Sequence, residues 1–345
     1  MSYQREFDQR IRVALVGIGS HAYRNILPVL HFLPVELMAV CNHSNRELAE
    51  RTAKEYHCRA YQDTGRMYDS EELDAVLFCV SAAQHPVLMK EALKRSLHVW
   101  AEKPIAMFAS QVEELIAIRG DKVAMCGYKK AFMPAVRKAI EVTNSPAYGN
   151  LESILAVYPM KMPKNGAQVL SSGQKTDWLL NGCHPLSVLL AIGGPVDYVI
   201  SATNAEGHGS NLLFFKNSVV GNLHLASGPQ PNEDYHLYAP SWHLQIANST
   251  KVILERGIPF EYGITTSFVP EGFDSGALVW ETQNCKATLE NMSFFVQGMY
   301  DELKTFCDCI LENRKPKIGS LEFSLEIMKI YEALLISNGK PVAIQ

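Results

Sequence analysis

The chain has 345 residues, of which 47% are hydrophobic and 20% are charged, and its formal net charge is −4. This length predicts about two globular domains, and the weakly negative charge excludes the basic surface of a nucleic-acid-binding or membrane-surface protein. No apolar run is long enough to span a bilayer, and the first residues are polar without a signal-peptide core. We therefore expect a cytoplasmic protein whose eight scattered cysteines are buried thiols.

The first predicted element is a strand-like apolar run over 13–16, followed directly by a small-residue turn and a helix over 23–32. Gly17 permits a tight turn, Gly19 allows the backbone to approach a pyrophosphate, and Ala22 allows close packing of the helix on the sheet. This context favours dinucleotide binding, with the phosphates at the helix N-terminus. The residues predicted to form this cofactor loop are Gly17, Ile18, Gly19, Ser20, His21 and Ala22.

The second strand is predicted over 35–41 and the next helix over 45–57, with Ser44 or Asn45 as its N-cap. The end of this strand normally reads the adenosine ribose, and here no carboxylate precedes Glu47. Asn42 can bond a ribose hydroxyl, and Ser44 and Arg46 can hold a 2′-phosphate, so the stretch favours NADP over NAD. Ser44 and Arg46 can equally be a solvated helix start.

Strands and helices continue to alternate up to residue 127. The strands are predicted over 74–80, 98–101 and 123–127, and the helices over 87–95 and 109–119. Such alternation predicts a parallel sheet covered on both faces, as in a Rossmann-type α/β domain.

Glu102-Lys103-Pro104 ends one of these strands. Ligands of this fold lie beyond the carboxyl ends of the strands, so Lys103 is expected to face a ligand rather than the outer surface. Pro104 disfavours helical geometry at Lys103. An ammonium beside a nicotinamide can bond a substrate oxygen or move a proton.

Three motifs resemble those of the Gfo/Idh/MocA oxidoreductase family, the relatives of glucose–fructose oxidoreductase and inositol dehydrogenase. The motifs are the glycine turn, Val80-Ser81-Ala-Ala-Gln-His85 and Glu102-Lys103-Pro104; segments 127–134, 300–306 and 338–342 are also similar. The resemblance covers nearly the whole chain. It implies an NAD(P)-dependent dehydrogenase or reductase acting on a sugar, polyol or related compound, with further cofactor contacts from Val80, Ser81, His85, Glu102 and Lys103.

A second domain is expected over 128–345, after a dinucleotide-binding domain over 1–127. Lys129 and Lys130 follow a strand end, where either can bind an anionic substrate or a phosphate, or be solvated. Residues 163–175 are predicted to be a loop or lid. Residues 176–193 have helical periodicity, which places Asp177, Leu180, Asn181 and His184 on one face.

His184 matches a histidine that the family carries on this helix, and it can act as general base or general acid. The family's aspartate would fall at Leu180 and a later acidic residue at Ser187, so both acids are missing. Either Asn181 or Asp177 substitutes, or the mechanism is altered or hydride transfer is lost. The predicted catalytic residues are Lys103 and His184, and the predicted substrate-binding residues are Lys103, Lys130, Asp177, Asn181 and His184.

Strand-like runs dominate beyond Pro195, and short turns between them predict antiparallel connections. They are 197–202, 211–215, 218–226, 235–239, 243–247, 251–255 and 286–290. We therefore expect an α+β domain with a large open, mainly antiparallel sheet, followed by helices over 300–311 and 320–337. Family members cover such a sheet with another subunit, which implies a homodimer or homotetramer. The histidines lack zinc-ligand spacing, so no metal is predicted.

The leading hypothesis is an NAD(P)-dependent oxidoreductase acting on a small-molecule substrate in a cleft between the domains. The alternative is a non-catalytic dinucleotide- or sugar-binding regulatory protein that kept the fold. The missing aspartate motivates this alternative, and the retained Glu102-Lys103-Pro104 argues against it.

Overall fold

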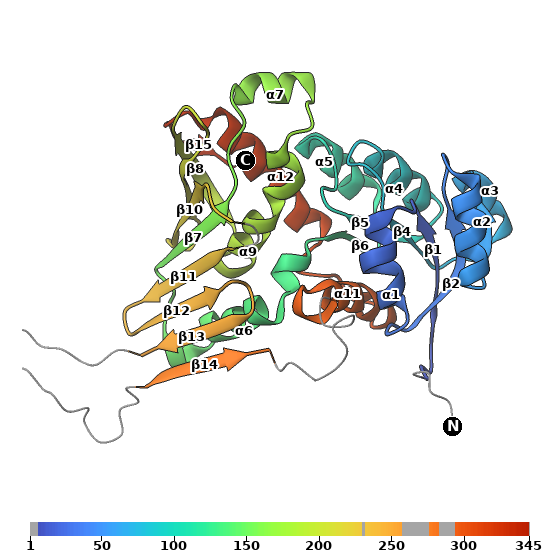
Figure 1. Ribbon diagram of the computed structural model, residues 1–345, viewed down its shortest axis with the longest axis horizontal. Coiled ribbons are helices and arrows are strands. Elements are labelled where there is room, and N and C mark those ends of the chain that lie inside the picture. Colours follow the sequence, from blue (N-terminus) through green and yellow to red (C-terminus); the bar gives the residue numbers. More distant parts are fainter. Residues whose placement is uncertain (1–5, 230–231, 257–275, 283–293, 345) are drawn as a thin grey trace, which may run out of the picture. The chain divides into compact units, whose positions relative to one another are not determined.

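The computed structural model describes residues 6–229, 232–256, 276–282 and 294–344. The chain forms two compact units (Figure 1): residues 1–129 with 298–328, and residues 130–297 with 329–345. The segment 298–328 thus clusters with the N-terminal part of the chain, whereas the division at residue 127 stays a prediction. Within the described residues, no helix combines the length and apolar character needed to cross a membrane.

The first unit contains a six-stranded sheet in which every neighbouring pair is parallel. Across the sheet the strands are β3 (Arg59–Tyr61), β2 (Val35–Cys41), β1 (Ile11–Val16), β4 (Ala75–Phe78), β5 (His98–Glu102) and β6 (Ala124–Gly127). All four residues of β4 are buried, as expected for a strand covered on both faces. This arrangement confirms the predicted Rossmann-type α/β fold.

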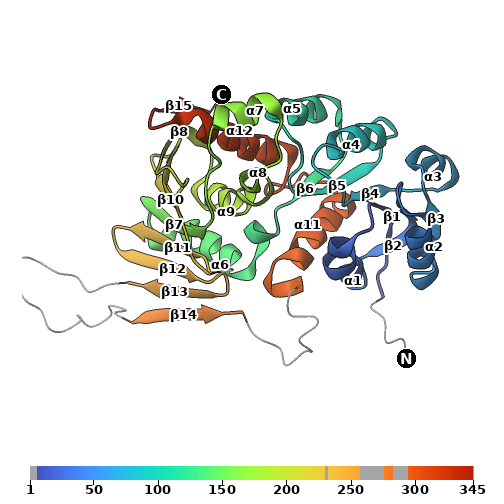
Figure 2. The ribbon, with the colours of Figure 1, turned by 45° about the horizontal axis from the view of Figure 1, so that its top comes forward.

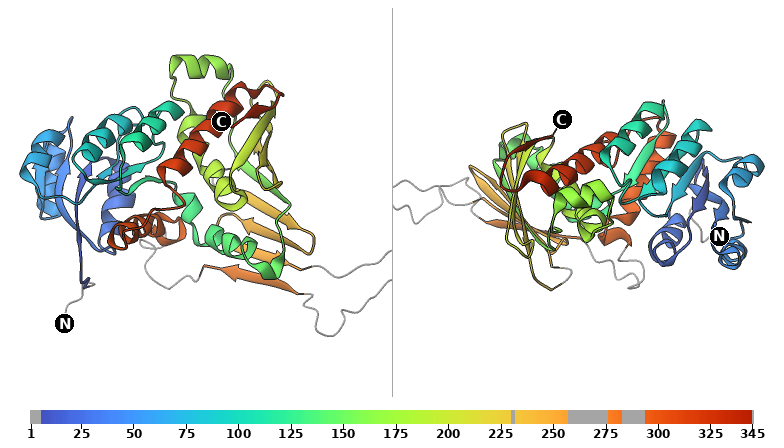
Figure 3. Two further views of the ribbon diagram at one scale, coloured as in Figure 1. Left: turned by 180° about the vertical axis from the view of Figure 1, so that it is seen from behind. Right: turned by 90° about the horizontal axis from the view of Figure 1, so that it is seen from above.

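Helices flank this sheet on both sides (Figure 3). They are the π-turn η1 (Ala22–Ile26), α1 (Leu27–Leu30), α2 (Arg46–Glu55), α3 (Thr64–Ser70), α4 (His85–Lys94), α5 (Ala109–Ile118), the 3₁₀ turn η2 (Lys129–Phe132) at the boundary of the unit, and α11 (Met299–Leu311). α11 comes from the far end of the sequence and packs against β6 (Figure 2). Because strand order reverses between β1 and β4, right-handed crossovers place helices on opposite faces and open a ligand position beyond the ends of these two strands.

The second unit contains a nine-stranded sheet that is antiparallel except for the pair β7–β10. In order across the sheet the strands are β14 (Ala277–Glu281), β13 (Lys251–Glu255), β12 (Trp242–Ala247), β11 (Asp234–Ala239), β7 (Ser153–Pro159), β10 (Val220–Ala226), β9 (Gly209–Phe215), β8 (Val196–Thr203) and β15 (Val342–Ala343). The predicted open, mainly antiparallel sheet is confirmed.

One face of this sheet packs on helices α6 (Pro134–Thr143) and α9 (Cys183–Gly193). Side chains alternate accordingly: Leu244 and Ile246 of β12 are fully buried, whereas His243 and Gln245 between them are not. The other helical elements are the 3₁₀ turn η3 (Pro146–Tyr148), α7 (Gly166–Ser172), α8 (Asp177–Asn181) and α12 (Leu321–Ser337), which begins in the first unit.

Three expectations about local structure need correction. The predicted loop over 163–175 contains the short helix α7, and the predicted helix over 176–193 is divided at Gly182 into α8 and α9. The expected helix over 23–32 begins as a π-turn and ends at Leu30. The expected strand over 286–290 lies outside the described residues.

Candidate functional site

The glycine turn lies where strand order reverses in the first unit. Gly17 follows β1 with φ = +92°, and a Cβ built on it would lie 2.3 Å from the carbonyl oxygen of Cys79, which follows β4. A side chain is therefore excluded at Gly17 both by conformation and by space. A Cβ on Gly19 would meet nothing within 4 Å, so its backbone borders open space. Ala22 is fully buried against the sheet. This cradle fits a dinucleotide pyrophosphate, as the sequence predicts.

Asn42 organises the loop after β2 by hydrogen bonds to the main chain. Its amide nitrogen donates to the carbonyl of Ile18 (3.0 Å), and its carbonyl oxygen accepts from the amide and hydroxyl of Ser44 (both 3.2 Å). Arg46 is exposed, and its Nε donates to Glu50 Oε1 (2.7 Å). Asn42 therefore connects the ribose-side loop to the glycine turn, while its ribose contact stays a prediction.

His85 lies inside the first unit rather than on its surface. It is fully buried, the Val80 amide donates to Nε2 (3.4 Å), and Nδ1 donates to the carbonyl of Pro104 (2.9 Å). Burial lowers the pKa of His85, so the ring stays neutral. The neighbouring Ser81 is exposed. His85 thus ties the loop after β4 to the turn that carries Lys103, and its predicted cofactor contact is untested.

Glu102 joins the glycine turn to Lys103. Its side chain is almost fully buried; Oε1 accepts from His21 Nε2 (2.7 Å), and Oε2 accepts from the backbone amide of Lys103 (3.0 Å). Lys103 itself is half-buried at the carboxyl end of β5. Of the predicted cofactor residues, the structure therefore brings His21, Glu102 and Lys103 into one hydrogen-bonded group.

Glu302 in α11 lies close enough to Glu102 for the charge of Glu102 to affect its pKa. It is not among the site residues that the sequence predicts. It is fully buried, and neither carboxyl oxygen has a hydrogen-bond partner among the described residues. A Cβ built on Gly127 would lie 2.9 Å from Glu302 Oε1. Burial, together with the nearby charge of Glu102, raises the pKa of Glu302 well above its usual value. An acid on the apolar stripe of an amphipathic helix, between Met299 and Phe306, is the signal that could have identified it.

In the second unit, His184 is the second residue of α9 and is largely buried. Thr176 caps α8 by accepting from the amide of Leu179, as predicted. Asp177 and Asn181 are hydrogen-bonded, with the amide of Asn181 donating to Asp177 Oδ1 (2.5 Å). The two polar candidates therefore act as a pair on one helical turn before His184.

The positions of the two missing family acids differ in exposure. Leu180 is 39% exposed, although it is a large apolar side chain on a short helix. Ser187 is fully buried, and its hydroxyl donates to the carbonyl of His184 (2.8 Å). Neither residue can supply a carboxylate, so only Asp177 remains as an acid among the candidates on α8 and α9.

Lys130 forms a buried ion pair. Its ammonium donates to Glu233 Oε1 (2.6 Å) and to the hydroxyl of Tyr158 (3.1 Å), and it lies 4.8 Å from the centre of the Tyr158 ring. The hydroxyls of Tyr235 (3.1 Å) and Ser249 (2.5 Å) also donate to Glu233. The positive charge of Lys130 is thus balanced within the unit, and substrate binding by Lys130 stays a prediction.

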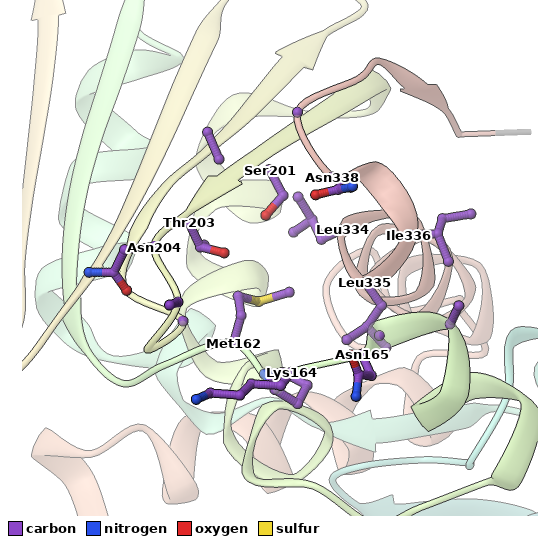
Figure 4. A pocket seen from close by; sticks show the side chains of 17 residues that line it. Met162, Lys164, Asn165, Ser201, Thr203, Asn204, Leu334, Leu335, Ile336 and Asn338 are labelled. Carbon is purple, nitrogen blue, oxygen red and sulfur yellow. The ribbon is translucent and has the colours of Figure 1, made fainter.

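A cavity of about 780 Å³ opens elsewhere in the second unit (Figure 4). Ser201 and Thr203 of β8, Asn165 and Asn338 contribute polar groups, and Met162 and Leu335 contribute apolar ones. None of the predicted substrate-binding residues is among its lining residues.

Comparison with known proteins agrees with this geometry. Residues 11–129 match the sequence profile described as "Oxidoreductase family, NAD-binding Rossmann fold", which is that of the Gfo/Idh/MocA proteins. Residues 11–129 are therefore similar to the NAD-binding domain of the Gfo/Idh/MocA oxidoreductases. The match spans β1 to β6 and includes the glycine turn, the loop of Asn42 and Lys103.

Two similar proteins are dTDP-3,4-didehydro-2,6-dideoxy-alpha-D-glucose 3-reductases. That of Saccharopolyspora spinosa is 26% identical over 151 residues, 43% of this chain and less than half (45%) of its own length. That of Streptomyces antibioticus is 23% identical over 69% of this chain and 75% of its own. A 3-ketoreductase from Actinomadura kijaniata, solved with TDP-benzene and NADP, superposes with a TM-score of 0.70 at 18% identity, over 96% of this chain and 99% of that one. The superposition shows a shared fold.

Proposed function

We propose that the protein is an NAD(P)-dependent oxidoreductase that transfers hydride between the nicotinamide C4 and a hydroxyl- or carbonyl-bearing carbon of a sugar, polyol or related compound. The observation that carries the proposal is the hydrogen-bonded group in the first unit. There the glycine turn and Lys103, at the carboxyl ends of β1 and β5, are joined through Glu102. The family match over residues 11–129 and the names of the two similar reductases add support.

When bound, the dinucleotide supplies or accepts the hydride. The residues of this chain then have separate tasks. Lys103 donates a hydrogen bond from its ammonium to the reacting oxygen, which favours the carbonyl or alkoxide-like form. In the oxidation direction His184 accepts the hydroxyl proton, and in the reduction direction it returns that proton. Asp177 and Asn181, which bond to each other, bind other substrate hydroxyls.

Replacing Lys103 by Met tests this assignment. Met fills a similar volume without a charge, so we expect NADPH affinity to stay within about threefold while kcat on a sugar and polyol panel falls at least about a hundredfold. NADPH fluorescence measures binding, and absorbance at the nicotinamide band measures turnover. Substantial turnover by Lys103→Met would sink the assignment.

NADP is our proposed preference over NAD. The supporting observation is that Ser44 and Arg46 are exposed directly after β2, in a loop that Asn42 holds against the glycine turn and in which no carboxylate precedes Glu47. The 3-ketoreductase with the same fold was solved with NADP.

A second candidate is a non-catalytic dinucleotide or sugar sensor. It is favoured by one observation, the exposed Leu180 where the family resemblance implies an aspartate. Saturable NADPH binding without turnover on the panel, in either direction, would support the sensor. The Leu180→Asp variant then separates a silenced enzyme, which gains turnover, from a sensor, which does not.

We also propose a cytoplasmic homodimer or homotetramer assembled through the sheet face opposite α6 and α9. Tyr198 and Phe214 stack at 4.3 Å on that face, and Leu212 lies beside them in the sheet. The described cysteines, such as the buried Cys41 and Cys307, are thiols, which suits a reducing compartment. Light scattering after size-exclusion chromatography measures the assembly, and a monomer would contradict it.

A further inference from the structure

We infer that His21 is a positioning residue that ties the dinucleotide loop to the backbone of Lys103 through Glu102. The inference rests on the proposed function, because it assigns His21 a role in the placement of Lys103. The sequence predicts that His21 is part of the cofactor loop. In the structure its ring also bonds a residue 81 positions further along the chain.

The hydrogen bonds around His21 fix which nitrogen carries the hydrogen. The side-chain amide nitrogen of Asn25, which only donates, lies 3.1 Å from His21 Nδ1. Nδ1 therefore accepts, and Nε2 donates to Glu102 Oε1 at 2.7 Å. Asn25 lies one helical turn after His21 and orients its ring, so the loop presents a fixed N–H donor to Glu102.

Glu102 needs this donor because it is buried. Only 6% of the residue is exposed, and its carboxylate accepts hydrogen bonds from His21 and from the Lys103 amide. A buried carboxylate that loses a donor either rotates toward another donor or takes up a proton. Both changes weaken the bond from the Lys103 amide to Glu102.

Glu302 and Glu102 differ in their hydrogen bonds. The carboxyl of Glu302 has no partner among the residues described, whereas Glu102 has two donors. Burial, and after it the charge of Glu102, raises the pKa of Glu302. His21 is the donor that reaches Glu102 from the glycine turn.

Two hydrogen bonds therefore connect the dinucleotide loop to the backbone of the proposed catalytic lysine. A loop ordered by a bound pyrophosphate holds His21, His21 holds Glu102, and Glu102 holds the Lys103 amide. A small misplacement of a reacting group costs a large factor in rate. Removal of His21 should therefore lower kcat more than it lowers affinity for the dinucleotide.

The test compares three full-length variants by hydrogen–deuterium exchange without cofactor, by NADPH titration and by turnover. His21→Ala removes the donor. His21→Gln replaces Nε2 by an amide nitrogen at similar reach. Tyr23→Phe is the matched control, because it removes a hydrogen bond from the same segment, to Thr52, without touching Glu102.

In His21→Ala we expect the Lys103 amide to exchange roughly tenfold faster than in the wild type. We also expect kcat to fall about tenfold, while the NADPH dissociation constant changes less than about threefold. In His21→Gln both the exchange rate at Lys103 and kcat should be close to those of the wild type. Tyr23→Phe should change neither quantity.

Unchanged exchange at Lys103 in His21→Ala, or equal acceleration in Tyr23→Phe, would overturn the inference. If His21→Ala does not fold, acceleration in His21→Gln as large as in a Glu102→Ala variant overturns it as well. The exchange result stands apart from the proposed function. Turnover in Lys103→Met would remove that function without changing how fast the Lys103 amide exchanges in His21→Ala.

Discussion

Two buried carboxylates, Glu102 in the first unit and Glu233 in the second, are stabilised in different ways. Glu233 faces an ammonium, that of Lys130, together with two hydroxyls. Glu102 has an imidazole N–H and a backbone N–H, and a second carboxyl lies unpaired nearby. The charge of Glu233 is neutralised inside its network, whereas that of Glu102 raises the pKa of a neighbouring acid.

We propose that this difference separates a structural network from a functional one. An ion pair with satisfied donors holds a fold together and leaves little charge to act on a ligand. A carboxylate that accepts from an imidazole N–H and a backbone N–H, beside a strand-end lysine and a glycine turn, is costly for the fold and is typical of an active site.

The largest expected effect concerns the ion pair between Lys130 and Glu233. Lys130→Met leaves Glu233 buried without its cation, so we expect the free energy of unfolding to fall by about 3–5 kcal/mol. Lys138→Met is the matched control. Its partner Glu141 lies three residues away at the surface, and the expected loss there is below about 1 kcal/mol.

Chemical denaturation followed by circular dichroism measures both changes. The double variant Lys130→Met with Glu233→Leu should recover much of the loss, because it removes the unpaired charge. Equal losses in Lys130→Met and Lys138→Met would mean that the Glu233 network is not the buried ion pair described here.

A smaller effect concerns the ribose side of the dinucleotide site. Ser44→Ala and Arg46→Ala should each weaken NADPH binding about tenfold, because each removes a donor to the 2′-phosphate. NADH binding should not change. Equal weakening of both dinucleotides would show that these residues only start the helix α2.

The smallest expected effect concerns the contribution of Glu302 to the pH dependence of stability. Its pKa is raised in the folded protein, so between the ordinary carboxyl pKa and the raised value the folded state binds more protons than the unfolded state. Stability conferred by the neutral acid is therefore lost as pH rises through this window. Glu302→Gln binds no proton in either state, so its stability relative to the wild type should increase with pH.

Denaturant titrations at several pH values above about 4.3, the ordinary carboxyl pKa, measure this trend. Glu102 and Lys129 are the charged groups that affect Glu302, the first raising and the second lowering its pKa. If the difference in unfolding free energy between Glu302→Gln and the wild type is constant with pH, the pKa of Glu302 is not raised in the folded protein.

The sequence predicted the parts of the fold that local patterns determine. The strand over 35–41 and the strand over 251–255 have the expected bounds, and Asn45 and Thr176 cap their helices through their own side chains. The glycine turn follows the first strand as expected, and at Gly17 both the positive φ and the nearby carbonyl of Cys79 exclude a side chain.

What the sequence could not predict depends on residues far apart in the chain. The bond of His21 to Glu102 spans 81 positions and that of Lys130 to Glu233 spans 103. No local pattern pairs such residues. The stretch of α7 is polar and rich in small residues, so its pattern predicts a loop rather than a helix. The edge strands β3 and β14 are too short or too exposed to show a clear period.

The measurement that tests the central claim most directly is a fluorescence titration of the purified protein with NADPH and with NADH, with Gly17→Ala as the control. We predict saturable binding of NADPH to the wild type, weaker binding of NADH, and binding at least about a hundredfold weaker in Gly17→Ala, because its methyl group would collide with the carbonyl of Cys79. Absence of binding of either dinucleotide, or equal binding by Gly17→Ala, would contradict the claim that this turn holds a dinucleotide, and the oxidoreductase proposal would fall with it.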